Sequence, residues 1–187
     1  MKPLLTLGGL LLLLLSACSD RSDPQEVDDD LSPPLLTAAE SGDLPTIRKL
    51  LDDNSPVDVK DACLWTPLMK AALNGHHEAV KRLLEAGANV NQLDKGGYSA
   101  LMLAASNNHA DIVELLLTHG ASIDQIEATG GWTALIWAAK QGHIDSVRAL
   151  LKHHPNAEIR DFEGLTAQEW AQKTQHQEIS ALLSNPR

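Results

Sequence analysis

The stretch TPLMKAA at residues 66–72 decides how this sequence is interpreted, because it recurs along the chain. Its later versions are SALMLAA at 99–105, TALIWAA at 133–139 and the weaker TAQEWAQ at 166–172. The starts lie 33, 34 and 33 residues apart, and a shorter version around Ala38-Ala39 marks a degenerate earlier copy. A fixed period of this length predicts a fold made of stacked repeats.

The residues within one copy predict two short helices. Thr66 is suited to cap a helix N-terminus, and Pro67 fits the first helical position, where its missing N–H does no harm. The paired alanines keep the first helix narrow, so that neighbouring copies can pack closely. Gly87 is suited to end the second helix in the left-handed conformation, and the turn residues at 94–97 predict a projecting hairpin.

This pattern resembles the ankyrin repeat, which places a β-turn and two helices in 33 residues around a T-P-L-H-x-A core. The resemblance runs from about Asp28 to the C-terminus and implies an all-α ankyrin-repeat solenoid of about five helix-turn-helix repeats with projecting β-hairpin turns. Met69, Met102 and Ile136 stand where the motif has histidine, and Leu64 replaces a turn glycine. The expected repeat domain is 35–187, with approximate repeats at 28–60 (degenerate), 61–93, 94–127, 128–160 and 161–187 (C-terminal cap).

Composition limits the functional classes. Hydrophobic residues make up 43% of the chain but aromatic residues only 3%, which favours packed helices over a β-sandwich or barrel. The formal net charge is −10, whereas nucleic-acid binding requires a surplus of Lys and Arg. We therefore expect no nucleic-acid partner.

Histidines recur at the repeat period, which raises the question of a metal or catalytic site. The resemblance implies that they lie at the turn between the two helices of a repeat and hydrogen-bond the backbone. The sequence contains no H-E-x-x-H, C-x-x-C, G-x-S-x-G, P-loop or G-x-G-x-x-G motif. We expect no catalytic residues, no metal ligands, no cofactor and no small-molecule substrate; a metal-dependent hydrolase using this column is the remote alternative. The recurring residues are His76, His109, His143 and His176.

The N-terminus has the pattern of an export signal. Lys2 precedes an apolar run over residues 4–15, which is too short to span a bilayer and is typical of a signal peptide, with a short membrane anchor as the alternative. The sequence LSAC at 15–18 resembles the bacterial lipobox, which implies removal of residues 1–17 and acylation of Cys18. Ser19 then implies the periplasmic face of the outer membrane, within the bacterial cell envelope. With Cys18 acylated, Cys63 is expected either to pack as a small apolar residue or to form an intermolecular disulfide.

An acidic segment follows the predicted lipid site. Residues 19–34 contain six acidic residues against one basic residue, Arg21, and almost no large apolar side chains. Such a composition cannot offset the entropy lost on ordering. We interpret residues 18–34 as an acylated cysteine with an acidic, disordered tether.

The resemblance also implies where a protein partner binds, because ankyrin repeats recognise proteins through hairpin tips and first-helix surfaces that line a concave groove. The tip column holds Trp65, Tyr98 and Trp132, followed by Leu165; these rings either anchor a partner or pack hairpin on hairpin. Trp137 and Trp170 share another column and are expected to pack internally. The first-helix columns, which are otherwise ordinary solvated positions, hold Leu73, Asn74, Ser106, Asn107, Lys140 and Gln141.

One hairpin carries an extra residue, which we place within residues 124–129. Insertions in repeat proteins often lie on the binding side, so the region of Tyr98, Trp132 and this longer hairpin is the expected centre of recognition. The sequence thus predicts a lipid-anchored, non-catalytic envelope protein that binds an unidentified protein. An inhibitor or immunity-type protein that blocks an envelope enzyme or toxin is the alternative.

Overall fold

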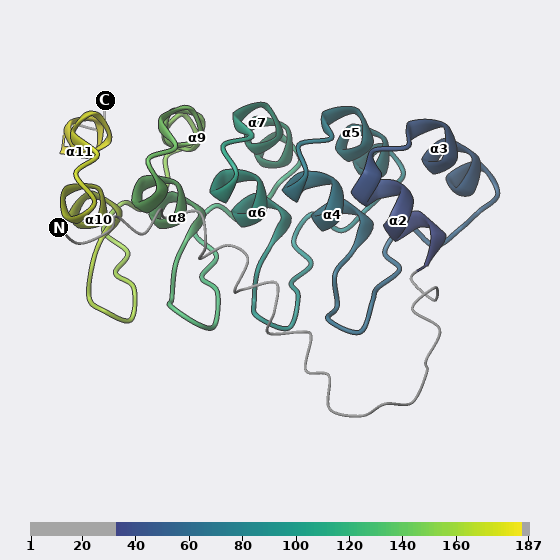
Figure 1. Cartoon of the computed structure of the whole chain (residues 1–187), viewed down its shortest axis with the longest axis horizontal. Helices are drawn as coiled ribbons and strands as arrows, with labels where there is room; N and C mark the ends of the chain where they lie inside the picture. Colours follow the sequence, from purple (N-terminus) through teal and green to yellow (C-terminus); the bar gives the residue numbers. More distant parts are fainter. Residues whose placement is uncertain (1–32, 185–187) are drawn as a thin grey trace, which may run out of the picture. The chain divides into compact units, whose positions relative to one another are not determined.

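The computed structural model describes residues 33–184, and the predicted signal peptide, Cys18 and almost all of the tether lie outside this range. All regular elements of the described part are helices, none of them long and apolar enough to cross a bilayer. They follow the chain as five pairs, each with a first and a second helix (Figure 1). The helices are α2 (Pro34–Ser41), α3 (Leu44–Asp52), α4 (Pro67–Leu73), α5 (His77–Glu85), α6 (Ala100–Ser106), α7 (Ala110–Thr118), α8 (Ala134–Gln141), α9 (Ile144–Leu151), α10 (Ala167–Lys173) and α11 (Gln177–Ser184).

Successive pairs stack on one another. The first helices α2, α4, α6, α8 and α10 contact their neighbours in order, and the second helices α3 to α11 form a parallel row. Hairpin turns project from the row of first helices, as Figure 1 shows. The predicted all-α stack of helix-turn-helix repeats is therefore confirmed.

The predicted helix ends are also confirmed. The side-chain oxygens of Thr66, Ser99 and Thr133 each accept a hydrogen bond from the backbone N–H three residues later. Thr166 does the same and completes a capping box with Glu169, whose carboxylate accepts from the Thr166 N–H at 2.7 Å. These bonds satisfy N–H groups that a short helix leaves without partners.

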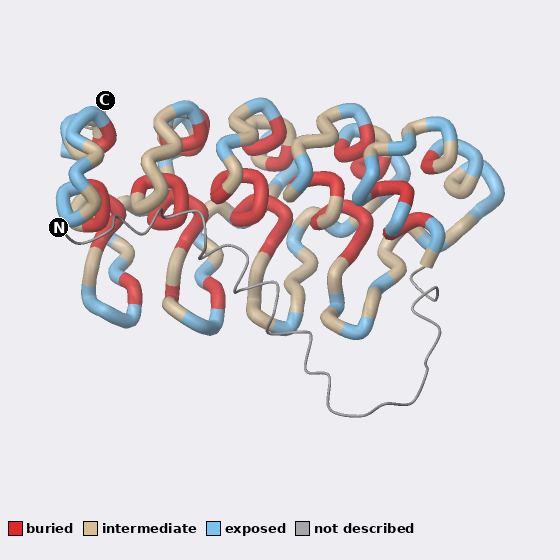
Figure 2. Tube along the Cα trace, viewed as in Figure 1, coloured by how far each residue is buried: buried red, intermediate tan, exposed pale blue. Residues whose placement is uncertain are grey.

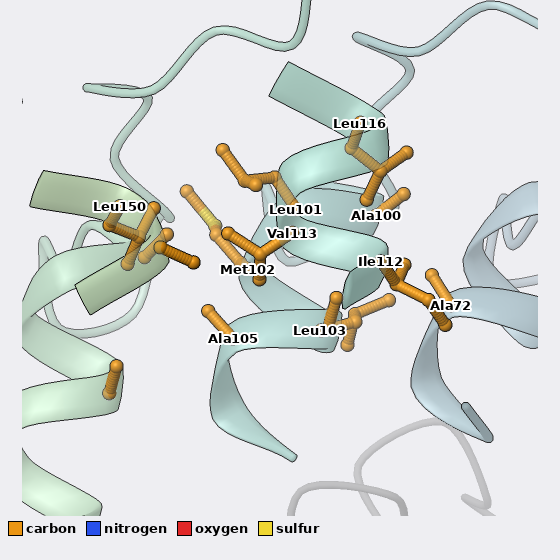
Figure 3. Packing of buried hydrophobic residues seen from close by; sticks show 14 of the residues in the cluster. Ala72, Ala100, Leu101, Met102, Leu103, Ala105, Ile112, Val113, Leu116 and Leu150 are labelled. Atoms are coloured by element: carbon orange, nitrogen blue, oxygen red, sulfur yellow. The ribbon is translucent and has the colours of Figure 1, made fainter. Parts of the chain in front are cut away.

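Narrow first helices and apolar second helices form one continuous core. The repeated alanines, among them Ala71, Ala104 and Ala138, have no exposed surface. In Figure 2 the buried residues concentrate along the first helices and on the inner side of the second helices. Figure 3 shows this packing in the middle of the stack, where Leu101 and Met102 of α6 and Val113 and Leu116 of α7 belong to one buried cluster.

Each hairpin turn is held by one carboxylate. A side-chain oxygen of Asp61, Asp94 or Asp161 accepts from the N–H groups two and four residues later, at 2.8–2.9 Å. In the longer hairpin Glu127 replaces aspartate, and its carboxylate accepts from the N–H groups of Thr129, Gly130 and Trp132. This bonding pattern places the extra residue between Glu127 and Trp132, whereas the sequence placed it within 124–129.

Successive hairpins are joined by single backbone hydrogen bonds. The N–H of Lys95 donates to the Cys63 carbonyl at 3.1 Å, that of Ala128 to the Gly96 carbonyl at 2.9 Å, and that of Phe162 to the Gly130 carbonyl at 2.9 Å. The four hairpins from residue 61 onward are therefore connected to one another as well as to their own helices.

Leu64 adopts a left-handed conformation, with φ of 65°, at a turn position that glycine occupies in the following repeats. This conformation costs a non-glycine residue roughly 1–2 kcal/mol, and glycine avoids that cost. The greater conformational freedom of glycine in the unfolded chain cancels about half of the resulting gain in stability. Leu64 is 38% exposed, so little packing is lost on its removal. We expect Leu64→Gly to raise the free energy of unfolding by about 0.5–1 kcal/mol, measured by urea denaturation. Leu64→Ala is the control, because it removes the same side chain but keeps the strain; an equal gain in both variants would contradict the explanation.

Candidate protein-interaction surface

The predicted tip column lies where the hairpin turns meet the first helices. Trp65, Tyr98, Trp132 and Leu165 are all half-buried and pack against the core. The backbone N–H of each is held by the carboxylate of its own hairpin, which fixes where the side chain leaves the turn. Three large aromatic side chains therefore stand at equivalent places in successive repeats.

Towards the C-terminal end these side chains join a larger group. Trp132 contacts Trp137 edge-on, with ring centroids 4.6 Å apart, and lies 6.3 Å from Trp170 in a similar orientation. Tyr98 lies 6.2 Å from Trp137. The ammonium nitrogen of Lys140 is 3.7 Å from the centroid of Trp132 and 3.9 Å from that of Trp170, within range of cation–π attraction. We call Tyr98, Trp132, Trp137, Lys140 and Trp170 the Trp/Lys cluster.

Asp161 fixes the orientation of two indoles in this cluster. Its Oδ2 accepts from Nε1 of Trp132 at 2.9 Å and from Nε1 of Trp170 at 2.6 Å. Burial alone would raise the pKa of Asp161, but the hydrogen bonds from the Leu165 N–H and the indoles outweigh it and leave the pKa below its ordinary value. The carboxylate therefore stays charged and ties two repeats together.

The expectation that Trp137 and Trp170 pack internally is confirmed, since each is only 5% exposed. Both nevertheless contribute rings to the Trp/Lys cluster. Trp137 contacts Trp132 and Tyr98, and Trp170 contacts Trp132 and Lys140. These two buried rings therefore support the half-buried side chains of Trp132 and Lys140 and are not themselves exposed to a partner.

The first-helix positions differ in their accessibility. Asn74 is exposed, whereas Leu73, Asn107, Lys140 and Gln141 are half-buried. Ser106, expected on the same surface, is buried at 6% exposure, and its hydroxyl donates to the Leu103 carbonyl at 3.0 Å. We use the term interaction surface for the hairpin turns together with the outward residues of the first helices.

Phe162 is a surface residue that the sequence reasoning missed. It is 67% exposed at the turn before α10, and its ring lies against Gly131 of the preceding hairpin. Its position three residues before Leu165 places it outside the tip column, so alignment of the repeats does not single it out. Only its identity as the single phenylalanine of the chain could have drawn attention to it.

Three of the four histidines in the column have a structural role. The Nε2 atoms of His76, His109 and His143 donate to backbone carbonyls of the preceding repeat, at Glu40 (2.9 Å), Leu73 (3.1 Å) and Ser106 (3.0 Å). These carbonyls lie at the C-terminal ends of first helices, where they lack partners within the helix. Burial lowers the pKa of His143, whereas the hydrogen bond to the Ser106 carbonyl opposes this change; Nε2 carries the donated proton in either case. Residues 33–184 contain no group of three or more His, Cys, Asp or Glu side chains that could hold a metal ion.

Comparison with known proteins identifies one family pattern. A family model described as ankyrin repeats (3 copies) matches residues 35–127 and again residues 123–186. The two matches together span the described helices α3 to α11 completely and all of α2 except Pro34. No curated protein matches the sequence.

Proposed function

Because this chain belongs to the ankyrin repeat family, we propose that its interaction surface binds a protein partner around Tyr98, Trp132 and the hairpin that contains Glu127. Ankyrin repeats indicate a protein–protein interaction module, and proteins built from them are generally non-catalytic. The fold alone supports many roles, so the choice of surface depends on its side chains.

The observation that carries this proposal is the Trp/Lys cluster. Trp and Tyr are the side chains most often found as anchors in protein interfaces, because they bury a large area and lose little conformational freedom. Here three indoles and a phenol gather on one part of the stack, and hydrogen bonds fix two of the indoles. A surface ordered before binding loses less entropy when the partner arrives.

A cross-linking experiment tests which side of the stack is contacted. Gln141 is half-buried at the end of first helix α8, and Gln177 is exposed on second helix α11. We expect a photo-reactive amino acid at position 141 to trap a partner in cells, and the same amino acid at 177 to trap none. Adding Tyr98→Ala and Trp132→Ala should abolish the cross-link at 141 while the helical circular dichroism spectrum is retained. Trapping from 177 alone, or trapping that survives the double substitution, would refute this assignment.

We further propose that the chain is held on a bacterial envelope membrane through acylated Cys18, on the periplasmic face of the outer membrane. The support is the sequence pattern of residues 1–18 and the acidic segment that follows it. Two or three acyl chains bury enough methylene groups for stable anchoring, whereas a single chain does not. The acidic segment would hold the repeat domain away from an anionic surface.

Fractionation of the full chain tests the anchor. We expect Cys18→Ala to move the protein from the membrane pellet to the soluble fraction, and Cys63→Ala, the matched control, to leave it in the pellet. Cys63 is disulfide-bonded in the structure, and pelleting alone does not identify the group attached to Cys18. The intact mass of the mature wild-type protein therefore decides the matter: a chain without acyl groups on Cys18 would refute the anchor.

A further inference from the structure

Lys140 is an ammonium group without a hydrogen-bond acceptor in the described part of the chain. It lies between the rings of Trp132 and Trp170 and is half-buried. Among residues 33–184, no oxygen is within hydrogen-bond or ion-pair distance of its Nζ. Burial lowers the pKa of Lys140, because desolvation disfavours the charged form; the charges of Glu163 and Asp161 oppose this change. The carboxylates of Glu163 and Asp161 therefore act on the pKa of Lys140 through space, without forming an ion pair with it.

Those two carboxylates are occupied elsewhere. Asp161 accepts from two indole N–H groups through one oxygen and from two backbone N–H groups through the other. Glu163 accepts from Nζ of Lys173 at 3.1 Å. Both carboxylates are thus directed at other donors, and neither lies within hydrogen-bond distance of Nζ of Lys140.

Lys140 is unusual among the cations of the repeat domain. The other half-buried cations in residues 33–184, Lys70 and Arg82, form ion pairs with Glu40 and Asp52 at 3.3 and 3.1 Å. Every remaining lysine or arginine of this range that lacks an ion pair is exposed, where water solvates it fully. Lys140 alone combines partial desolvation with the absence of an ion pair among the described residues, and the faces of two indoles are its favourable contacts there.

A second donor without an acceptor lies in the same cluster. Nε1 of Trp137 is buried and has no hydrogen-bond partner among the described residues, although Trp137 is only 5% exposed. The centroid of its ring system lies 4.6 Å from that of Trp132, the residue that covers Lys140. The cluster therefore contains two donors without an acceptor among the described residues, and of these two only the half-buried Lys140 can be reached by a partner.

We propose that Lys140 binds a carboxylate from the protein partner, supplied by an Asp or Glu side chain in a segment that also carries a large apolar residue. This inference rests on the proposed protein-binding function and specifies the partner's chemistry. The carboxylate gains a charge-assisted bond to an ammonium that is already partly desolvated and held between two indoles. The apolar residue packs on the rings of Tyr98 and Trp132, which are half-buried and so leave part of their surface for contact.

Selection of random peptides against the full chain tests the proposal without a known partner. We expect the selected peptides to share an acidic residue close to an aromatic or large aliphatic residue. Selection of neutral apolar peptides only would overturn the carboxylate assignment and leave the proposed function standing. Recovery of no binding peptide would contradict the proposed function itself. A further outcome is that acidic peptides are enriched only after Asp28, Asp29 and Asp30 are changed to Asn. That result would overturn the carboxylate proposal, because it would indicate that the chain's own acidic segment occupies the site.

Affinity measurements on one selected peptide test whether Lys140 is the residue that binds its carboxylate. We expect Lys140→Gln to weaken binding about tenfold or more, and Lys140→Arg, which keeps a cation between the indoles, to restore most of the affinity. Lys81→Gln is the matched control, because Lys81 is exposed on second helix α5, outside the interaction surface, and should change binding less than about twofold. Thermal unfolding of each variant confirms an intact fold. Equal losses from Lys140→Gln and Lys81→Gln would overturn the proposal, because they would indicate a general effect of net charge.

Discussion

Replacing Asp161 with alanine is expected to lower the free energy of unfolding by about 3–5 kcal/mol, measured by urea denaturation. Its side chain is 5% exposed and accepts hydrogen bonds from Nε1 of Trp132, Nε1 of Trp170 and the N–H groups of Glu163 and Leu165. Alanine leaves these four donors without their acceptor, and a buried donor that loses its acceptor costs about 1–3 kcal/mol. Donors that reach water recover part of that loss, so the total is less than the sum.

Asp61→Ala provides the matched comparison. Asp61 holds the backbone of its own hairpin in the same way, through the N–H groups of Cys63 and Trp65, but binds no indole in the described structure. We expect a loss of about 1–2 kcal/mol there. Losses of equal size at the two positions would show that the indole bonds contribute nothing, and would contradict the role given to Asp161 in the Trp/Lys cluster.

Leu101→Ala is expected to lower the free energy of unfolding by about 2–5 kcal/mol. Leu101 is 1% exposed in α6, at the middle of the stack, where the removed methyl groups leave a cavity between tightly packed helices. Because each repeat is stabilised by its neighbours, a weakened central repeat separates the stack into two shorter pieces. Hydrogen exchange should therefore accelerate in the repeats on both sides of α6.

Leu183→Ala is the control at the end of the stack. Leu183 is also buried, at 5% exposure, but α11 has a neighbouring repeat on one side only within residues 33–184. Faster exchange should then be confined to α10 and α11. If Leu183→Ala accelerated exchange as far as α4, the repeats would be coupled over the whole domain rather than between neighbours.

The fold was predictable because it depends on local signals that the sequence repeats. Thr66 and Gly87 mark helix ends by their own conformational preferences, and the structure places them there. The period then places equivalent residues on neighbouring repeats, which is why the backbone bonds of the histidine column and the burial of Trp137 could be expected.

The details of the interaction surface were less predictable, because a column assigns a position but not a side-chain direction. Lys140 and Ser106 occupy equivalent places in neighbouring repeats, yet Lys140 reaches between two indoles and Ser106 turns back to its own helix. The pairing of Lys140 with Trp170 depends on rotamers in two different repeats. The role of Glu127 was also missed. Its side chain is one methylene longer than that of aspartate, so its carboxylate reaches the N–H groups of a turn that is one residue longer. This match between side-chain length and turn length becomes visible only in the three-dimensional structure.

The backbone bonds that join successive hairpins have a thermodynamic consequence. The links from Lys95 to Cys63, from Ala128 to Gly96 and from Phe162 to Gly130 make a set of loops behave as one preorganised platform. Loops that moved independently would each have to be immobilised by a ligand, and each would add an entropic penalty. For this domain, calorimetry of complex formation should report a small unfavourable entropy and a heat capacity change set by the contact area alone.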